Sequence, residues 1–139
     1  EASVLLGREV TQIDQMHEAA QDLYSLCGTG GAVYLKGGHA EGDLLRDVFY
    51  DGKRFVDLDG PRVHTKNTHG TGCTLSSAIA ALWARTDNLE EAVRAARRYM
   101  QQAIAAADDL SVGHGHGPVH HFARFEALFA ADESLENQA

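Results

Sequence analysis

Residues 65–81 read TKNTHGTGCTLSSAIAA, a glycine-containing turn that runs directly into a helical pattern. Apolar residues recur there at the spacing of one helix face, namely Leu75, Ala78, Ile79 and Leu82. The spacing predicts a helix that starts close to Gly72. The first backbone N–H groups of a helix have no partner within it, and together with the positive end of the helix dipole they form an anion site. The stretch therefore predicts a helix whose first turn faces an anion.

Cys73 occupies one of the first positions of this predicted helix. The field at a helix N-terminus favours a thiolate over a thiol, which makes this cysteine a candidate base or nucleophile beside a phosphate. Gly70 and Gly72 would allow the backbone to approach a ligand closely. The alternative is a tight glycine turn with a small buried cysteine, and the spacing alone leaves the two interpretations open.

Two patterns upstream predict a small sheet. Residues 32–36 read AVYLK, a short apolar run bounded by glycines that predicts a buried strand parallel to its neighbours. Residues 46–58 alternate on both sides of Asp51-Gly52, the dipeptide typical of a type I′ turn, and predict a β-hairpin. Lys36 would leave the carboxyl end of its strand, where open α/β sheets bind ligands. It is a candidate cation for a phosphate, or otherwise an edge residue with an exposed amine.

Helical signals surround the sheet pattern. Residues 1–6 predict the end of a helix that stops at Gly7, and Thr11 with Asp14 predicts a capping-box start for a helix reaching about Leu26. Asn88 with Glu91 predicts the cap of a later helix whose buried stripe is Leu89, Val93, Ala96, Met100 and Ile104. A linker over 59–66 and a short helix over 124–130 complete the expectation. Aromatic residues at helical spacing are expected in a core or interface: Trp83, Tyr99, Phe122, Phe125 and Phe129.

The order of these elements indicates an α/β protein. One parallel strand with one hairpin makes a poor sheet, because its edges would stay unpaired, so we expect the second half of a larger α/β domain. The chain also begins at Glu1 rather than at methionine, which fits a portion of a longer polypeptide.

Composition narrows the classes of function. With 139 residues, 44% of them hydrophobic, the chain can build a core, and its net charge of −8 disfavours nucleic acid and anionic membranes as partners. The two cysteines are too few for a disulfide framework and fit a reducing cytosol. We expect no membrane-spanning or signal segment. Small molecules and proteins are therefore the expected partners.

Four motifs carry a family resemblance: KGGH at 36–39, DVFYDGK at 47–53, TKNTHGTGCTLSSAIAA at 65–81 and GHGPVHHF at 115–122. In this order and spacing they resemble the C-terminal half of hydroxymethylpyrimidine/phosphomethylpyrimidine kinases of thiamine biosynthesis, members of the ribokinase-like superfamily. The resemblance implies a three-layer α/β/α sandwich. Residues 1–139 would be its C-terminal, nucleotide- and phosphate-binding half, and the N-terminal half that forms the substrate pocket would be absent.

The resemblance also implies an activity. The enzyme would use ATP and Mg²⁺ to phosphorylate 4-amino-5-hydroxymethyl-2-methylpyrimidine and then its monophosphate. The anion hole for the transferring phosphoryl group would be Gly70, Thr71, Gly72 and Cys73, with Cys73 also the base. The ATP phosphates would be bound by Lys36, Asn67 and Thr68, and Glu1 would act on Mg²⁺ through water. The complete enzyme would be a cytoplasmic homodimer.

Other functions stay open beside the kinase. The chain could be a nucleotide-binding or interaction fragment without activity of its own, or part of a related pyridoxal-type kinase. A cysteine at a helix N-terminus in a chain with eight histidines could also form the Cys-His pair of a thiol enzyme. A metal site could use the histidines of one loop: His114, His116, His120 and His121. His-Gly alternation lacks the fixed support of a structural zinc site, so we favour an ordinary loop there.

Overall fold

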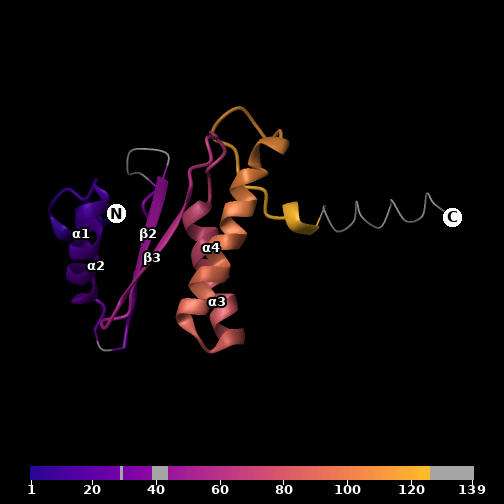
Figure 1. Cartoon of the computed structure of the whole chain (residues 1–139). Helices are drawn as coiled ribbons and strands as arrows, with labels where there is room; N and C mark the ends of the chain where they lie inside the picture. The colour runs from indigo at the N-terminus through magenta and orange to yellow at the C-terminus, as the bar shows by residue number, and fades with distance from the viewer. Residues whose placement is uncertain (29, 39–43, 126–139) are drawn as a thin grey trace. The chain divides into compact units, whose positions relative to one another are not determined.

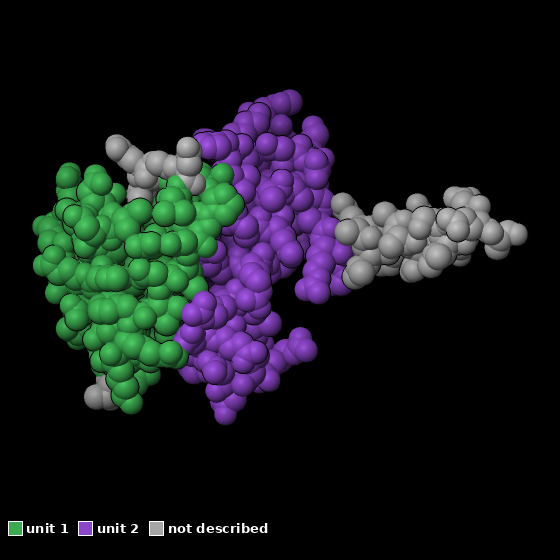
Figure 2. Space-filling model, in the orientation of Figure 1, with its two compact units in different colours: residues 1–62 green, residues 63–139 purple. Residues whose placement is uncertain are grey.

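The computed structural model describes residues 1–28, 30–38 and 44–125 (Figure 1). The chain divides into two compact units, Glu1–Arg62 and Val63–Ala139, which Figure 2 colours separately. The described residues of unit 1 form two α-helices and a three-stranded sheet, whereas the described part of unit 2 is mainly helical. The mixture of helix and sheet agrees with the α/β class predicted from the sequence.

The helices of unit 1 begin and end close to the predicted residues. They are α1 (Ala2–Leu6), the short 3₁₀ helix η1 (Ile13–Gln15) and α2 (Met16–Tyr24). Gly7 ends α1 in the left-handed conformation with φ 64°, as predicted. The predicted capping box of Thr11 and Asp14 is wrong, because Gln12 and Gln15 form it instead. A glutamine side chain can serve both ends of this motif, since its amide carries a donor and an acceptor.

The sheet has the order β1-β2-β3, with strands β1 (Val33–Leu35), β2 (Leu44–Tyr50) and β3 (Phe55–Pro61). The hairpin is confirmed, but β3 extends three residues into the predicted linker. The prediction that β1 is parallel to its neighbour is wrong, because β1 pairs antiparallel with β2 and Val33 lies opposite Tyr50. A parallel connection needs a crossover of a dozen or more residues, and only residues 36–43 separate the two strands.

The hairpin turn differs from the predicted two-residue type I′ turn. Tyr50 pairs with Phe55, so the loop has four residues, and only Gly52 adopts a positive φ, 87°. The carboxylate of Asp51 accepts hydrogen bonds from the backbone N–H groups of Arg54 and Lys53, at 2.9 and 2.8 Å. These two bonds lower the pKa of Asp51. The stabilisation is present above the usual carboxyl pKa and is lost as the pH falls through the lowered value.

Helix α2 packs on β1 and β2 to form the core of unit 1 (Figure 1). The buried side chains of this core are Met16, Ala20, Leu23, Val33 and Val48. Burying a side chain of the valine or leucine type stabilises a fold by about 1.5–3 kcal/mol, so this cluster contributes several kcal/mol to the stability of the unit.

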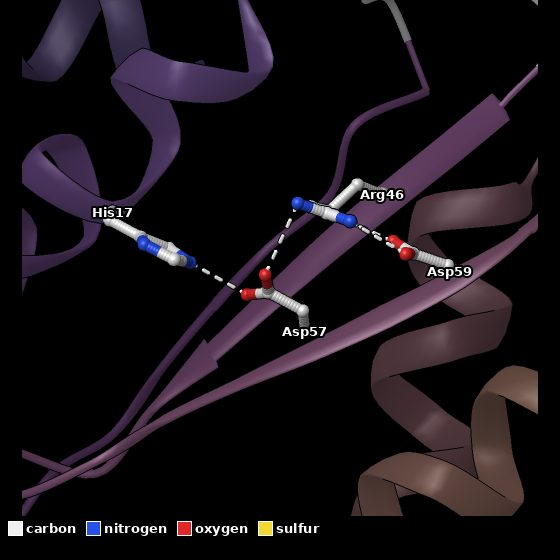
Figure 3. A network of polar contacts seen from close by, with 4 residues as sticks. All are labelled: His17, Arg46, Asp57 and Asp59. Carbon is white, nitrogen blue, oxygen red and sulfur yellow. Dashed lines mark hydrogen bonds and ion pairs between the residues drawn. The ribbon is translucent and has the colours of Figure 1, made fainter.

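A polar network connects β2 and β3 of the same sheet with helix α2 (Figure 3). Arg46 and Asp59 lie directly opposite each other on β2 and β3, and their side chains meet at 2.6 Å. Asp57 accepts from Arg46 at 3.3 Å and lies 2.6 Å from Nε2 of His17 on α2. Exposed pairs of this kind contribute little stability each, but opposite charges at facing positions favour one register of the hairpin.

Unit 2 contains a helical pair, α3 (Thr71–Thr86) and α4 (Leu89–Ala105), followed by the 3₁₀ helix η2 (Ala107–Asp109). The start of α3 lies one residue before the predicted Gly72. The predicted cap of α4 is confirmed, because Oδ1 of Asn88 accepts from the N–H of Glu91 at 3.1 Å, a contact worth about 1 kcal/mol. The buried face of α4 is Ala92, Val93, Ala96, Met100 and Ala103, while Leu89 and Ile104 are half-buried.

Three of the aromatic residues predicted to lie in a core or interface are exposed in unit 2, so they are not core residues of the described chain, and their place in an interface stays a prediction. Trp83 is 49% exposed, Phe122 66% and Phe125 55%. Phe129 and most of the helix predicted over 124–130 lie outside the described residues. Within the described residues, no helix is both long enough and apolar enough to cross a membrane.

Candidate functional site

The first turn of α3 has the geometry that the sequence predicts for an anion site. Gly70 is the N-cap in the left-handed conformation, φ 84°, and no side chain caps the helix there. Thr71 N donates to Thr68 O at 3.4 Å, and Thr74 N donates to Gly70 O at 2.9 Å. The N–H groups of Gly72 and Cys73 lie between these two donors, in the first turn of a helix of 16 residues. Two backbone donors at a helix N-terminus suit a phosphate oxygen.

Cys73 is the third residue of α3 and is exposed. The alternative of a small buried cysteine is therefore wrong. An exposed thiol in the first turn can reach a ligand held by the same turn, which is what a base beside a phosphate requires. Cys27, the other cysteine, is also free and exposed, but it follows the C-terminal end of α2 in unit 1.

Asn67 is a buried residue in the loop that leads to α3, with a relative exposure of 7%. Its side-chain amide donates to Ala107 O at 3.1 Å and to Asp108 Oδ1 at 2.9 Å. Its Oδ1 accepts from Gly117 N at 3.1 Å. Both amide hydrogens therefore have protein partners, which differs from the phosphate contact that the resemblance implies for Asn67.

The Gly/His loop lies beside the residues that precede α3. His69 N donates to Gly117 O at 3.0 Å, and His69 forms a parallel bridge with Pro118. His116 Nδ1 lies 3.1 Å from Lys66 O, and the backbone N–H of the buried His120 donates to Ala103 O. Residues 1–28, 30–38 and 44–125 contain no group of three or more His, Cys, Asp or Glu side chains that could hold a metal ion. The loop therefore supports the segment before α3.

Unit 1 has a cavity of about 230 Å³ that brings together two predicted site residues, Glu1 and Lys36. Its other lining residues include Ser3, Thr11, Gln12 and Gly37. Among the described lining residues, one carboxylate and one ammonium group meet at this cavity, which suits phosphate with Mg²⁺, because Mg²⁺ keeps several waters and uses few protein ligands. The residues present are therefore compatible with the expected role of Glu1 through water.

Asp47 binds residues on both sides of Lys36, at β1 and just after it. Its two carboxylate oxygens accept from Gly37 N at 2.9 Å and from the Tyr34 hydroxyl at 2.7 Å. The sequence alone predicts no role for Asp47, or for Gly117 as the partner of Asn67. Asp47 belongs to the motif DVFYDGK and Gly117 to the motif GHGPVHHF. Their presence in these motifs is the feature of the sequence that could have pointed to a role for them.

The model of the family described as phosphomethylpyrimidine kinase matches residues 1–120. The chain belongs to this family. It is 47% identical over 126 residues to the hydroxymethylpyrimidine/phosphomethylpyrimidine kinase of Rhizobium meliloti, covering 90% of this chain and 47% of the relative. Its identity to the Escherichia coli enzyme of the same name is 44% over 123 residues, covering 88% of this chain and 46% of the relative.

A solved structure shows the same fold. The chain superposes on the pyridoxal kinase of Bacillus subtilis, solved as an ADP complex, with a TM-score of 0.80 and 33% identity. The match covers 89% of this chain and 46% of that structure, and it confirms the expected ribokinase-like α/β fold. The chain thus spans about half the length of the relatives it matches.

Proposed function

We propose that this chain is the phosphate-binding half of an ATP-dependent hydroxymethylpyrimidine/phosphomethylpyrimidine kinase of thiamine biosynthesis. The observation that carries the proposal is the uncapped start of α3 at Gly70 and Cys73, in a chain that the family matches over residues 1–120. The remaining half of such an enzyme would supply the pyrimidine pocket. The complete enzyme would be a cytoplasmic homodimer, as the family resemblance implies.

The reaction assigns a separate task to each group of the α3 turn. The hydroxymethyl oxygen of the pyrimidine attacks the γ-phosphorus, the bond from that phosphorus to the ADP oxygen breaks, and ADP leaves. The proton of the hydroxyl passes to Sγ of Cys73, which must be a thiolate to accept it. The N–H groups of Gly72 and Cys73 donate to the oxygens of the transferring group, where charge stabilisation is the main catalytic demand.

Lys36 and Glu1, at the cavity of unit 1, are proposed to bind the charged part of the nucleotide. The ammonium group of Lys36 would neutralise ATP phosphates, and Glu1 would bind Mg²⁺ through water. When bound, Mg²⁺ would screen the negative charge of the phosphates. Thr68 is proposed to donate its hydroxyl to the same phosphates, whereas we assign Asn67 no phosphate contact because its amide is occupied.

The test is an assay of the complete enzyme that contains this chain. We expect ATP-dependent conversion of hydroxymethylpyrimidine to its monophosphate and then to its diphosphate. Mass spectrometry of the products measures both steps. Pyridoxal belongs in the same assay, because the solved structure that matches the chain is a pyridoxal kinase. Phosphorylation of pyridoxal alone would replace the proposed substrate, and absence of any ATP-dependent product would refute the kinase.

Replacing Lys36 by methionine in the complete enzyme should lower kcat/KM for ATP by roughly ten- to a hundredfold. The expected loss in kcat/KM follows from the contribution of a hydrogen bond to a charged group, which is about 1.5–3 kcal/mol. Lys53→Met is the matched control, because Lys53 is an exposed lysine in the hairpin loop of the same unit. Steady-state kinetics with varied ATP measure the effect. Equal losses in both variants would remove Lys36 from the proposed site.

A further inference from the structure

We infer that Asn67 is a positioning residue, which sets the geometry of the α3 anion turn without touching substrate. The inference rests on the proposed kinase function. It replaces the phosphate contact expected for Asn67 with a different role: holding the residues before Gly70 against two other segments of unit 2.

The side chain of Asn67 joins three segments that are far apart in the sequence. It donates to Ala107 O and to Asp108 Oδ1, and it accepts from Gly117 N. The Thr65 hydroxyl adds a second connection, since it donates to Asp108 Oδ1 and accepts from Asn67 N. A buried polar group with all of its partners present favours one conformation, because losing a partner leaves an unsatisfied donor or acceptor.

Gly117 transmits this arrangement to the residue that precedes the anion turn. Its N–H donates to Asn67, and its carbonyl accepts from the N–H of His69, at 3.1 and 3.0 Å. His69 is adjacent to Gly70, the N-cap of α3. A Cβ atom on Gly117 would lie 2.3 Å from Asn67 Oδ1, so the close approach requires glycine. The position of the α3 turn is therefore coupled to the amide of Asn67 through one residue.

The coupling matters because donors to a transferring phosphoryl group act only when they are correctly placed. A displacement of about 1 Å can lower a rate by about a hundredfold. Both amide hydrogens of Asn67 are bound to protein acceptors, so the side chain has no donor left for the transferring phosphoryl group. Its loss should therefore lower kcat while leaving KM for the pyrimidine largely unchanged.

The experiment substitutes Asn67→Asp in the complete enzyme. Aspartate keeps the shape of asparagine and the acceptor for Gly117 N, but its second oxygen would face Ala107 O and the Asp108 carboxylate. We expect kcat to fall by roughly ten- to a hundredfold, with KM for the pyrimidine changed less than about threefold. Adding Asp108→Asn returns a hydrogen-bond donor to the contact between residues 67 and 108. We expect this second substitution to recover at least about a third of the decrease in log kcat.

Asn88→Ala is the matched control. It also removes an asparagine side chain of unit 2 that accepts a backbone N–H, but it lies at the opposite end of α3. We expect it to lower stability and leave kcat unchanged. If Asn67→Asp does not fold, Thr65→Val tests the positioning role instead, because it removes the second connection to Asp108. We expect this variant to lower kcat by at least about fivefold.

The outcomes separate the inference from the function on which it rests. An unsubstituted enzyme without kinase activity would refute the proposed function. An active enzyme in which folded Asn67→Asp keeps its kcat would overturn the positioning role, as would a loss that appears equally in KM and is not reversed by Asp108→Asn. If only Thr65→Val can be measured, an unchanged kcat would overturn it.

Discussion

Replacing Cys73 by serine in the complete enzyme is expected to lower kcat by about 10²- to 10⁴-fold, with little change in KM for ATP. The range is the usual contribution of a general base. A serine hydroxyl keeps the size and position of the thiol but gives up its proton far less readily, so it cannot accept one from the substrate. The backbone N–H of residue 73 is kept, and the anion turn of α3 should therefore still bind phosphate.

Cys27→Ser is the matched control, because Cys27 is the second exposed free cysteine of the chain. We expect this variant to keep its full rate. Alkylation with iodoacetamide gives an independent measurement: ATP should slow inactivation through Cys73 and leave the labelling of Cys27 unchanged. A Cys73→Ser enzyme with the full phosphorylation rate would exclude Cys73 as the base and leave the anion turn intact.

The parts of the site that depend on local sequence could be predicted. A glycine before an apolar helical pattern fixes where α3 begins, and Asn88 three residues before Glu91 fixes where α4 begins. In both cases the cause lies within four residues, because a helix start is determined by its own first turn. The exposure of Cys73 does not follow from this local argument, because the same spacing also fits a small buried cysteine; the structure decides between the two.

The parts that depend on distant residues could not be predicted. The contacts of Asn67 are set by pairings across the fold, such as the one with Gly117, which lies 50 positions further along the chain. The sequence around Asn67 suits a phosphate ligand as well as a structural amide, because the same donors serve both. Exposed aromatic residues are a similar case: Trp83 has a helical spacing typical of a core, but spacing does not reveal what covers that face.

Replacing Gly37 by alanine should destabilise unit 1 by at least about 3 kcal/mol. Overpacking usually costs about 1–3 kcal/mol, and the effect here should lie at or beyond the upper limit because the obstacle is backbone. A Cβ atom on Gly37 would lie 2.0 Å from Arg46 O on β2, in a strand that cannot move without breaking its pairing with β3. The hydrogen bond from Gly37 N to Asp47 would be lost at the same time. Chemical denaturation of the complete enzyme measures the change.

Gly38→Ala is the control for this substitution, because no atom of the described residues lies within 4 Å of the Cβ position of Gly38. We expect Gly38→Ala to leave the free energy of unfolding within about 0.5 kcal/mol of the original value. Gly37→Ala should also lower kinase activity in whatever fraction stays folded, since the displaced backbone carries the adjacent Lys36. If both variants were equally stable, the strand end would have to tolerate a side chain at 37, and Asp47 could not be what fixes Lys36. A stability loss in Gly37→Ala with full activity would instead show that Lys36 acts independently of the strand that carries it.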